Sequence, residues 1–151
     1  NFNKKSVNYK IKIVDESYNC NPTSLAASLA AVKYLKFDVL DYKDEISFRR
    51  IAILGDMLEL GDQESEFHEE IIKLDSIDYF DIVHCVGTII EGLHKKLPES
   101  KKGLIVRNPK DLIPHLLNNV QDKDVYVVKG SNSIGLSSLV TELCNIDGEN
   151  I

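Results

Sequence analysis

Three short polar segments carry the residue types best suited to binding a small ligand, and they span residues 15–22, 55–62 and 129–133. Carboxylates can accept hydrogen bonds from ribose hydroxyls, and amides can bond to phosphate or peptide groups. A lysine at a strand end, followed by glycine and by hydroxyl and amide side chains, can hold a carboxylate or a phosphate. These residue types favour a site for a polar or anionic small molecule.

Ordinary turn chemistry is the alternative explanation for these segments. In the first, helix capping accounts for Asn21 and for Pro22 at the first helical position, but not for Tyr18 or Asn19. In the last, the glycine after Lys129 could serve only the backbone dihedral angles of a strand-to-helix turn. Ligand binding is therefore a prediction for both segments, with a simple turn as the alternative.

The glycine spacing of the chain does not complete a phosphate-binding loop. Gly87 with Gly92 and Gly130 with Gly135 have the spacing of a P-loop, but neither pair is followed by Lys-Ser or Lys-Thr. The lysine that reaches the terminal phosphates and the hydroxyl that holds Mg²⁺ are thus missing from both. We do not expect this chain alone to hydrolyse a nucleotide, although backbone N–H groups at a helix start can still attract an anion.

The four histidines indicate neither a metal site nor a catalytic pair. His84 stands inside an apolar run and is predicted to be a core residue, whereas His94 and His115 are predicted at surface positions of helices. His68 follows the second polar segment, within reach of its acids. No second histidine stands at ligand spacing from another, so no metal is expected.

Apolar runs and helix-start signals predict five strand–loop–helix units. Strands are predicted over residues 9–14, 50–54, 81–86, 103–106 and 124–129. Helices are predicted over about 23–36 and 63–74, over a short stretch from Gly87 to about 96, from Asn108-Pro109 to about 118, and over 135–144.

This order of elements predicts a single α/β domain with a mainly parallel sheet and helices on both faces. The ordered core is expected over about residues 9–146 of the domain, and residues 147–151 are expected to form a frayed tail. Ligands of such sheets bind beyond the carboxyl ends of the strands, where all three polar segments are predicted to lie.

Composition excludes several classes of protein. The 151 residues include 18 Lys plus Arg and 24 Asp plus Glu, for a net charge of −6, and the basic residues occur in scattered pairs. Nucleic acid is therefore not expected as a partner. No apolar run approaches the roughly 18–20 residues of a membrane span. Three cysteines without CxxC spacing indicate reduced thiols in a cytoplasmic protein, and Asn1 at the start suggests a piece of a longer chain.

Three strings, taken together, resemble a known family. They are Asp-Glu-Ser-Tyr-Asn-Cys-Asn-Pro at 15–22, Leu-Gly-Asp-Met-Leu-Glu-Leu-Gly at 54–61 and Lys-Gly-Ser at 129–131. In this order they resemble the C-terminal domain of the Mur ligases, over about residues 10–145. The first two strings are specific to the member that adds D-alanyl-D-alanine, and His68 also fits its pattern.

The resemblance implies a three-domain, ATP-dependent amide ligase of peptidoglycan synthesis, with this chain as its Rossmann-like third domain. The first domain would hold the UDP-sugar of UDP-MurNAc-tripeptide, and the central domain would carry the P-loop and the Mg²⁺ sites. ATP would phosphorylate the tripeptide's terminal carboxylate, and the amine of D-Ala-D-Ala would attack the acyl phosphate. The third domain would close over the second, position the amine and exclude water. Alone, it is expected to be an inactive monomer.

The resemblance also implies roles for individual residues, with the nucleotide near the first string and the dipeptide near the other two. The expected nucleotide-binding residues are Asp15, Glu16, Tyr18, Asn19 and Asn21, and the expected substrate-binding residues are Asp56, Met57, Glu59, His68, Lys129, Ser131 and Asn132. No catalytic residue and no metal ligand is expected in this part of the ligase.

The chain departs from the family pattern at three positions. Glu16 stands where the family usually has Asp, so the expected ribose partner is Asp15 or Glu16. Cys20 stands where Ala or Ser is common, and Asn132 stands where Arg often follows Lys-Gly-Ser. The alternatives are the corresponding domain of another Mur-type or a folylpolyglutamate-type ligase, whose matching loops usually carry a histidine, and a stand-alone α/β binding domain.

Overall fold

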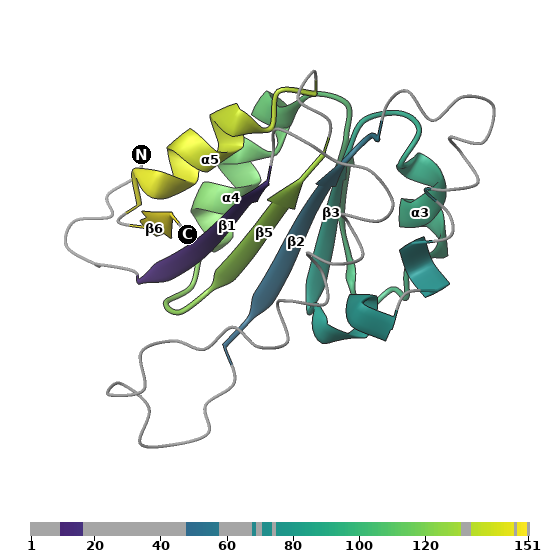
Figure 1. Ribbon diagram of the computed structural model, residues 1–151, viewed down its shortest axis with the longest axis horizontal. Coiled ribbons are helices and arrows are strands. Elements are labelled where there is room, and N and C mark those ends of the chain that lie inside the picture. Colours follow the sequence, from purple (N-terminus) through teal and green to yellow (C-terminus); the bar gives the residue numbers. More distant parts are fainter. Residues whose placement is uncertain are drawn as a thin grey trace.

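A six-stranded, fully parallel sheet is the centre of the molecule (Figure 1). The computed structural model describes residues 10–16, 48–57, 68, 71–73, 75–130, 134–146 and 148–150. The strands are β1 (Ile11–Glu16), β2 (Arg50–Gly55), β3 (Ile82–Val86), β4 (Lys102–Val106), β5 (Val125–Lys129) and β6 (Gly148–Asn150). Their order across the sheet is β4-β3-β2-β5-β1-β6, which confirms the predicted parallel α/β class.

Both faces of the sheet are buried, which explains why the central strands are almost continuously apolar. Successive side chains point to opposite faces, so Ala52 and Leu54 enter one apolar cluster while Ile51 and Ile53 enter the other. The three central residues of β5 divide between the clusters in the same way. The central strands β2 and β5 therefore pack against helices on both faces of the sheet.

Helices cover both faces, as predicted. One layer contains α3 (Glu91–Lys96) with the 3₁₀ turns η4 (Ile71–Lys73) and η5 (Asp75–Tyr79), and the other contains α4 (Ile113–Asn119) and α5 (Ser137–Cys144) (Figure 1). A short 3₁₀ turn, η6 (Pro109–Asp111), precedes α4. Asn108 caps η6, because its side chain accepts a hydrogen bond from Lys110 N at 3.0 Å. The predicted helix start at Asn108-Pro109 is thus confirmed, although its first turn is 3₁₀.

Two predicted strand boundaries are wrong, one at the end of β1 and one at the C-terminal end of the chain. The first strand extends to Glu16, because Asp15 and Glu16 continue the backbone ladder with β5. The expected frayed tail instead contains β6, which pairs in parallel with the first half of β1. Gly-Glu-Asn has no apolar alternation, so sequence patterning does not reveal this strand, which pairs with β1 through its backbone. The predicted helix over 23–36 and most of the one over 63–74 lie outside the described residues.

Candidate functional site

The three polar segments follow three neighbouring strands. Strand β5 lies between β1 and β2, and in register Lys129 is paired with Glu16 on one side and with Leu54 on the other. Parallel strands are about 4.8 Å apart, so the three segments begin within two strand spacings of one another. The expectation that they meet at one edge of the sheet is confirmed for the residues at which they begin.

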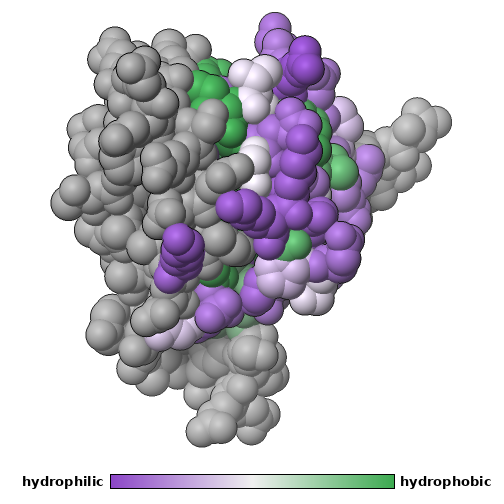
Figure 2. All heavy atoms as spheres, turned by 90° about the vertical axis from the view of Figure 1, so that its right-hand side faces the viewer, coloured by the Kyte–Doolittle hydropathy of each residue, from purple (hydrophilic) through white to green (hydrophobic). Residues whose placement is uncertain are grey.

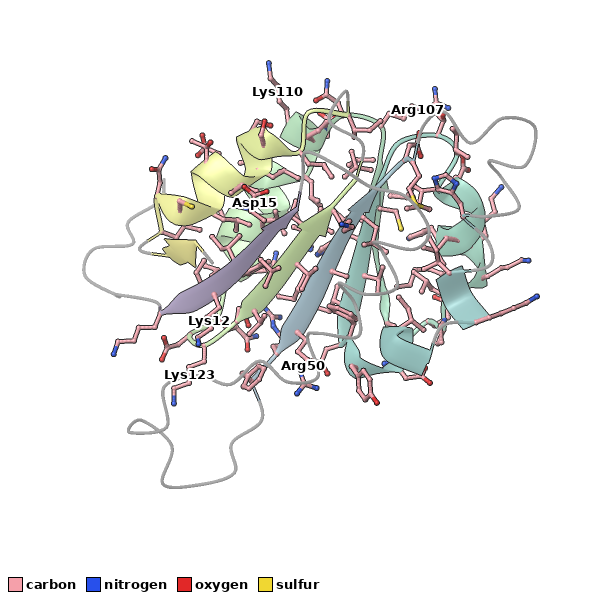
Figure 3. The ribbon with its side chains drawn as sticks, in the orientation of Figure 1. Lys12, Asp15, Arg50, Arg107, Lys110 and Lys123 are labelled. Atoms are coloured by element: carbon pink, nitrogen blue, oxygen red, sulfur yellow. The ribbon has the colours of Figure 1, made fainter. Side chains whose placement is uncertain are left out.

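The two acids of the first segment lie on the last two positions of β1 rather than in a loop, which corrects the predicted boundary. Asp15 is half-buried and lies toward the carboxyl end of β1 (Figure 3). Tyr18, Asn19 and Asn21 lie outside the described residues.

Lys129 is the cation at the centre of this edge and is only 3% exposed. A buried ammonium group must be paired or hydrogen-bonded, because leaving water costs it a large solvation free energy. In the backbone ladder its partners are Glu16 of β1 and Leu54 of β2. Ser131 and Asn132, which follow it, lie outside the described residues.

Two glycines let β2 and β5 approach closely just beyond Lys129. A Cβ atom added to Gly130 would lie 2.9 Å from the Cα atom of Gly55 and 2.7 Å from Cδ1 of Leu136. A Cβ atom on Gly55 would likewise lie 2.9 Å from Cδ1 of Leu136. The strand ends are therefore in backbone contact, with Leu136 packed against both glycines.

Asp56, directly after β2, has hydrogen bonds at both of its carboxylate oxygens. Its two oxygens accept hydrogen bonds from Thr88 N at 3.0 Å and from Ile90 N at 2.8 Å, and the residue is 4% exposed. Its own backbone N–H donates to Val86 O at 3.0 Å. The carboxylate thus joins the end of β2 to the turn that follows β3.

The next residue, Met57, is fixed by a histidine. Met57 N donates a hydrogen bond of 2.7 Å to Nε2 of His68, and the two residues are 1% and 0% exposed. Because this ring nitrogen accepts, it carries no proton in this arrangement. Glu59 lies outside the described residues.

The turn around Gly87 belongs to this constellation and is absent from the predicted site. Gly87 has a φ angle of +130°, and a Cβ atom there would overlap the carboxylate of Asp56. The amides that follow Gly87 could have served an external anion, but the anion they bind is Asp56. The sequence signal for this turn is a glycine directly after a predicted strand.

The structure confirms the core prediction for His84 and places His94 on α3 and His115 on α4, on helices as predicted. His84 is 3% exposed and its Nδ1 accepts a hydrogen bond from Leu104 N at 3.0 Å, as expected of a core residue. His94 and His115 are half-buried at these helix positions. His94 bonds through Nε2 to Gly103 O at 2.8 Å, and the His115 ring lies 5.3 Å from that of His84.

The two described cysteines, Cys85 and Cys144, are free thiols. Burial raises the pKa of Cys85 to about 12, and the negative charge of Asp56 acts in the same direction. A thiol that stays protonated is a poor nucleophile and a poor metal ligand. Among the described residues, no group of three or more His, Cys, Asp and Glu could hold a metal ion.

Other surface features lie away from this edge. A hollow of about 420 Å³ lies at the amino end of the strands and includes Phe48, Arg50, Asp81 and Lys123 in its lining. Figure 3 shows Arg50 and Lys123 at the end of the sheet opposite to Asp15.

Figure 2 shows that the coloured surface on the side of α3 is mainly hydrophilic, with hydrophobic atoms in separate spots. No helix in the described part of the chain is long and apolar enough to cross a membrane.

The fold and the edge define a class: a parallel α/β domain whose binding residues follow neighbouring central strands. Residues 2–132 match the family described as "Mur ligase, glutamate ligase domain", and the chain belongs to this family.

Named relatives agree with this family. The chain is 30% identical over 137 residues to UDP-N-acetylmuramoyl-tripeptide–D-alanyl-D-alanine ligase of Bacillus subtilis (strain 168), covering 88% of this chain and 28% of the relative. The chain therefore spans little more than a quarter of that relative's length.

Solved structures agree in fold. MurF from Acinetobacter baumannii superposes with a TM-score of 0.70 at 20% identity, covering 88% of this chain and 28% of that one. MurF ligase from Thermotoga maritima, solved in complex with ADP, superposes with a TM-score of 0.68 at 23% identity, covering 91% and 29%.

Proposed function

We propose that this chain is the C-terminal domain of an ATP-dependent ligase that joins D-Ala-D-Ala to UDP-MurNAc-tripeptide in peptidoglycan synthesis. The observation that carries the proposal is the convergence of the three family strings on adjacent strands β1, β5 and β2. The name of the Bacillus subtilis relative supports the same substrates.

In the proposed reaction, the terminal carboxylate of the tripeptide takes the γ-phosphoryl group of ATP, which leaves ADP and an acyl phosphate. The amine of D-Ala-D-Ala attacks the acyl carbon, forms the amide bond, loses a proton and displaces phosphate. Mg²⁺ would neutralise phosphate charge in the central domain. The C-terminal domain formed by this chain would orient the reactants and exclude water.

The residues divide between the two reactants along the edge. Asp15, Glu16, Tyr18, Asn19 and Asn21 are proposed to hold the nucleotide, with one acid on the ribose, and Lys129, Ser131, Asn132 and Glu59 are proposed to hold the dipeptide. The strand order supports this division, because Lys129 on β5 lies about one strand spacing from the nucleotide group that begins on β1. A bacterial cytoplasmic location is proposed with the same function.

Phosphate release by the full-length ligase tests the proposal, with UDP-MurNAc-tripeptide and D-Ala-D-Ala added singly and together. We expect release to require both acceptors, and to fall by roughly tenfold or more in Glu16→Ala and Asn19→Ala, equivalent to about 1.4 kcal/mol of transition-state stabilisation. Lys95→Ala is the control, because Lys95 lies on α3 with 72% of its side chain exposed. Release that ignored the dipeptide would refute the acceptor assignment.

A further inference from the structure

The residues that follow β2 turn their polar atoms inward, although family resemblance places them near the dipeptide. We propose that Asp56 and His68 are positioning residues. They hold the end of β2 in place. Because Gly130 at the end of β5 packs against the end of β2, they also fix where the dipeptide-holding segment begins. This inference rests on the proposed function and names how one of its sites is built.

The first anchor is the carboxylate of Asp56. Both of its oxygens already accept backbone hydrogen bonds, from Thr88 and Ile90, and 4% exposure leaves little surface for a ligand. Gly87, within the same turn, donates a hydrogen bond to Val106 O at 2.8 Å, which connects the turn to the end of β4. A charged acceptor with two amide donors holds the end of β2 more firmly than a neutral side chain would.

The second anchor is His68, which comes from a different segment of the chain. Its Nε2 accepts from Met57 N at 2.7 Å, and the imidazole is fully buried. Asp56 and Met57 are consecutive, so two hydrogen-bonded anchors act on the two residues that directly follow β2.

Close packing carries this position to β5. Leu54 is paired with Lys129 in the ladder, and the next residues, Gly55 and Gly130, are in backbone contact. No side chain lies between the two glycines to absorb a displacement, and Leu136 packs against both. A shift of the β2 end is therefore passed to Gly130 and to the segment that it begins.

Steady-state kinetics of the full-length ligase tests the inference, with each of the three substrates varied in turn. In Asp56→Ala we expect the KM for D-Ala-D-Ala to rise roughly tenfold, or about 1.4 kcal/mol. The KM values for ATP and for UDP-MurNAc-tripeptide should change by less than about twofold. A general loss of stability would not separate the three substrates in this way.

Gly87→Ala separates positioning from direct contact. It keeps the carboxylate of Asp56 but places a methyl group into it, so we expect the same selective rise in the dipeptide KM. Gly103→Ala is the matched control. Gly103 lies on the outer strand β4, and the added methyl group would overlap the buried ring of His84. It should lower stability without changing the dipeptide KM.

His68 supplies a second test if the first variants do not fold. His68→Gln keeps an acceptor near the position of Nε2 and should retain the dipeptide KM, whereas His68→Leu should raise it. The inference is overturned if Asp56→Ala raises the dipeptide KM and Gly87→Ala does not, since Asp56 would then touch the dipeptide. It is also overturned if all three KM values rise together or if none changes.

Amide hydrogen exchange keeps the anchors testable apart from the activity. Loss of the carboxylate in Asp56→Ala should speed exchange at Thr88 and Ile90, and unchanged exchange there would remove the structural basis of the inference. If the parent ligase shows no dipeptide-dependent release of phosphate, the proposed function fails. The exchange experiment still tests whether Asp56 holds the turn that follows β3.

Discussion

His84 is a buried base held neutral by its surroundings. Burial lowers its pKa from 6.5 to about 4, and His115, Arg49 and His94 act in the same direction. Its Nδ1 accepts from Leu104 N, and a protonated ring could not do so. The residue therefore links the strength of the β3–β4 edge to pH.

Between about pH 6.5 and about pH 4, the unfolded chain binds a proton at His84 that the folded chain does not. The stability contributed by neutral His84 is thus complete above pH 6.5 and is lost as the pH falls toward 4. We expect the free energy of unfolding of the 151-residue chain to fall by up to about 3 kcal/mol from this group. Urea titrations across this pH range measure it.

His84→Asn is the variant for comparison, because its Oδ1 can accept from Leu104 N without titrating. Its stability should be lower at neutral pH, since a smaller side chain leaves a cavity, but its slope against pH should be flatter. An equal slope in the parent and variant would contradict the assignment to His84.

Among the elements, β2 and β5 are joined at their amino ends by an ion pair between a fully buried carboxylate and a partly exposed guanidinium group. Asp124 is fully buried and accepts from Arg49 Nε at 3.0 Å and Nη2 at 2.7 Å, and from Tyr126 OH at 2.9 Å. The hydrogen bond to Asp124 raises the pKa of Arg49. At their carboxyl ends the same strands meet through Gly55 and Gly130, so β2 and β5 are held together at both ends.

Removing the cation should strongly destabilise this pair of strands. Arg49→Met leaves a buried carboxylate without its charged partner, and we expect a loss of about 3–5 kcal/mol in unfolding free energy. Arg107→Met makes the same substitution at an exposed position after β4 and should change stability by less than about 0.5 kcal/mol. Denaturant unfolding compares the two, and similar losses would show that the ion pair is not the cause.

For the whole molecule, we expect the 151-residue chain to bind ATP weakly, because most nucleotide contacts would belong to the central P-loop domain of the proposed ligase. Calorimetric titration of the chain with Mg·ATP should give a Kd well above a micromolar. A sub-micromolar Kd would show that this domain carries a nucleotide site of its own. The chain should also release no phosphate from ATP when both acceptors are present.

Local patterning predicts most of the scaffold. The runs of Ile, Val and Leu in the central strands are long enough to identify these strands, because both faces of the sheet are buried. The pattern is lost at the polar ends, where Asp15 and Glu16 continue β1 and Gly148–Asn150 adds β6. Backbone hydrogen bonds with a neighbouring strand hold these residues, and a neighbour is a property of the folded chain.

The candidate site divides in the same way. The three strings and the strands that precede them can be identified from the amino-acid sequence, because residue type and local order are written along the chain. The position of β5 between β1 and β2, and the bonding of Asp56 to amides more than thirty positions away, become apparent in the folded chain. Contacts between distant residues depend on strand order and packing, so no local spacing rule distinguishes a buried anchor from a group facing a ligand.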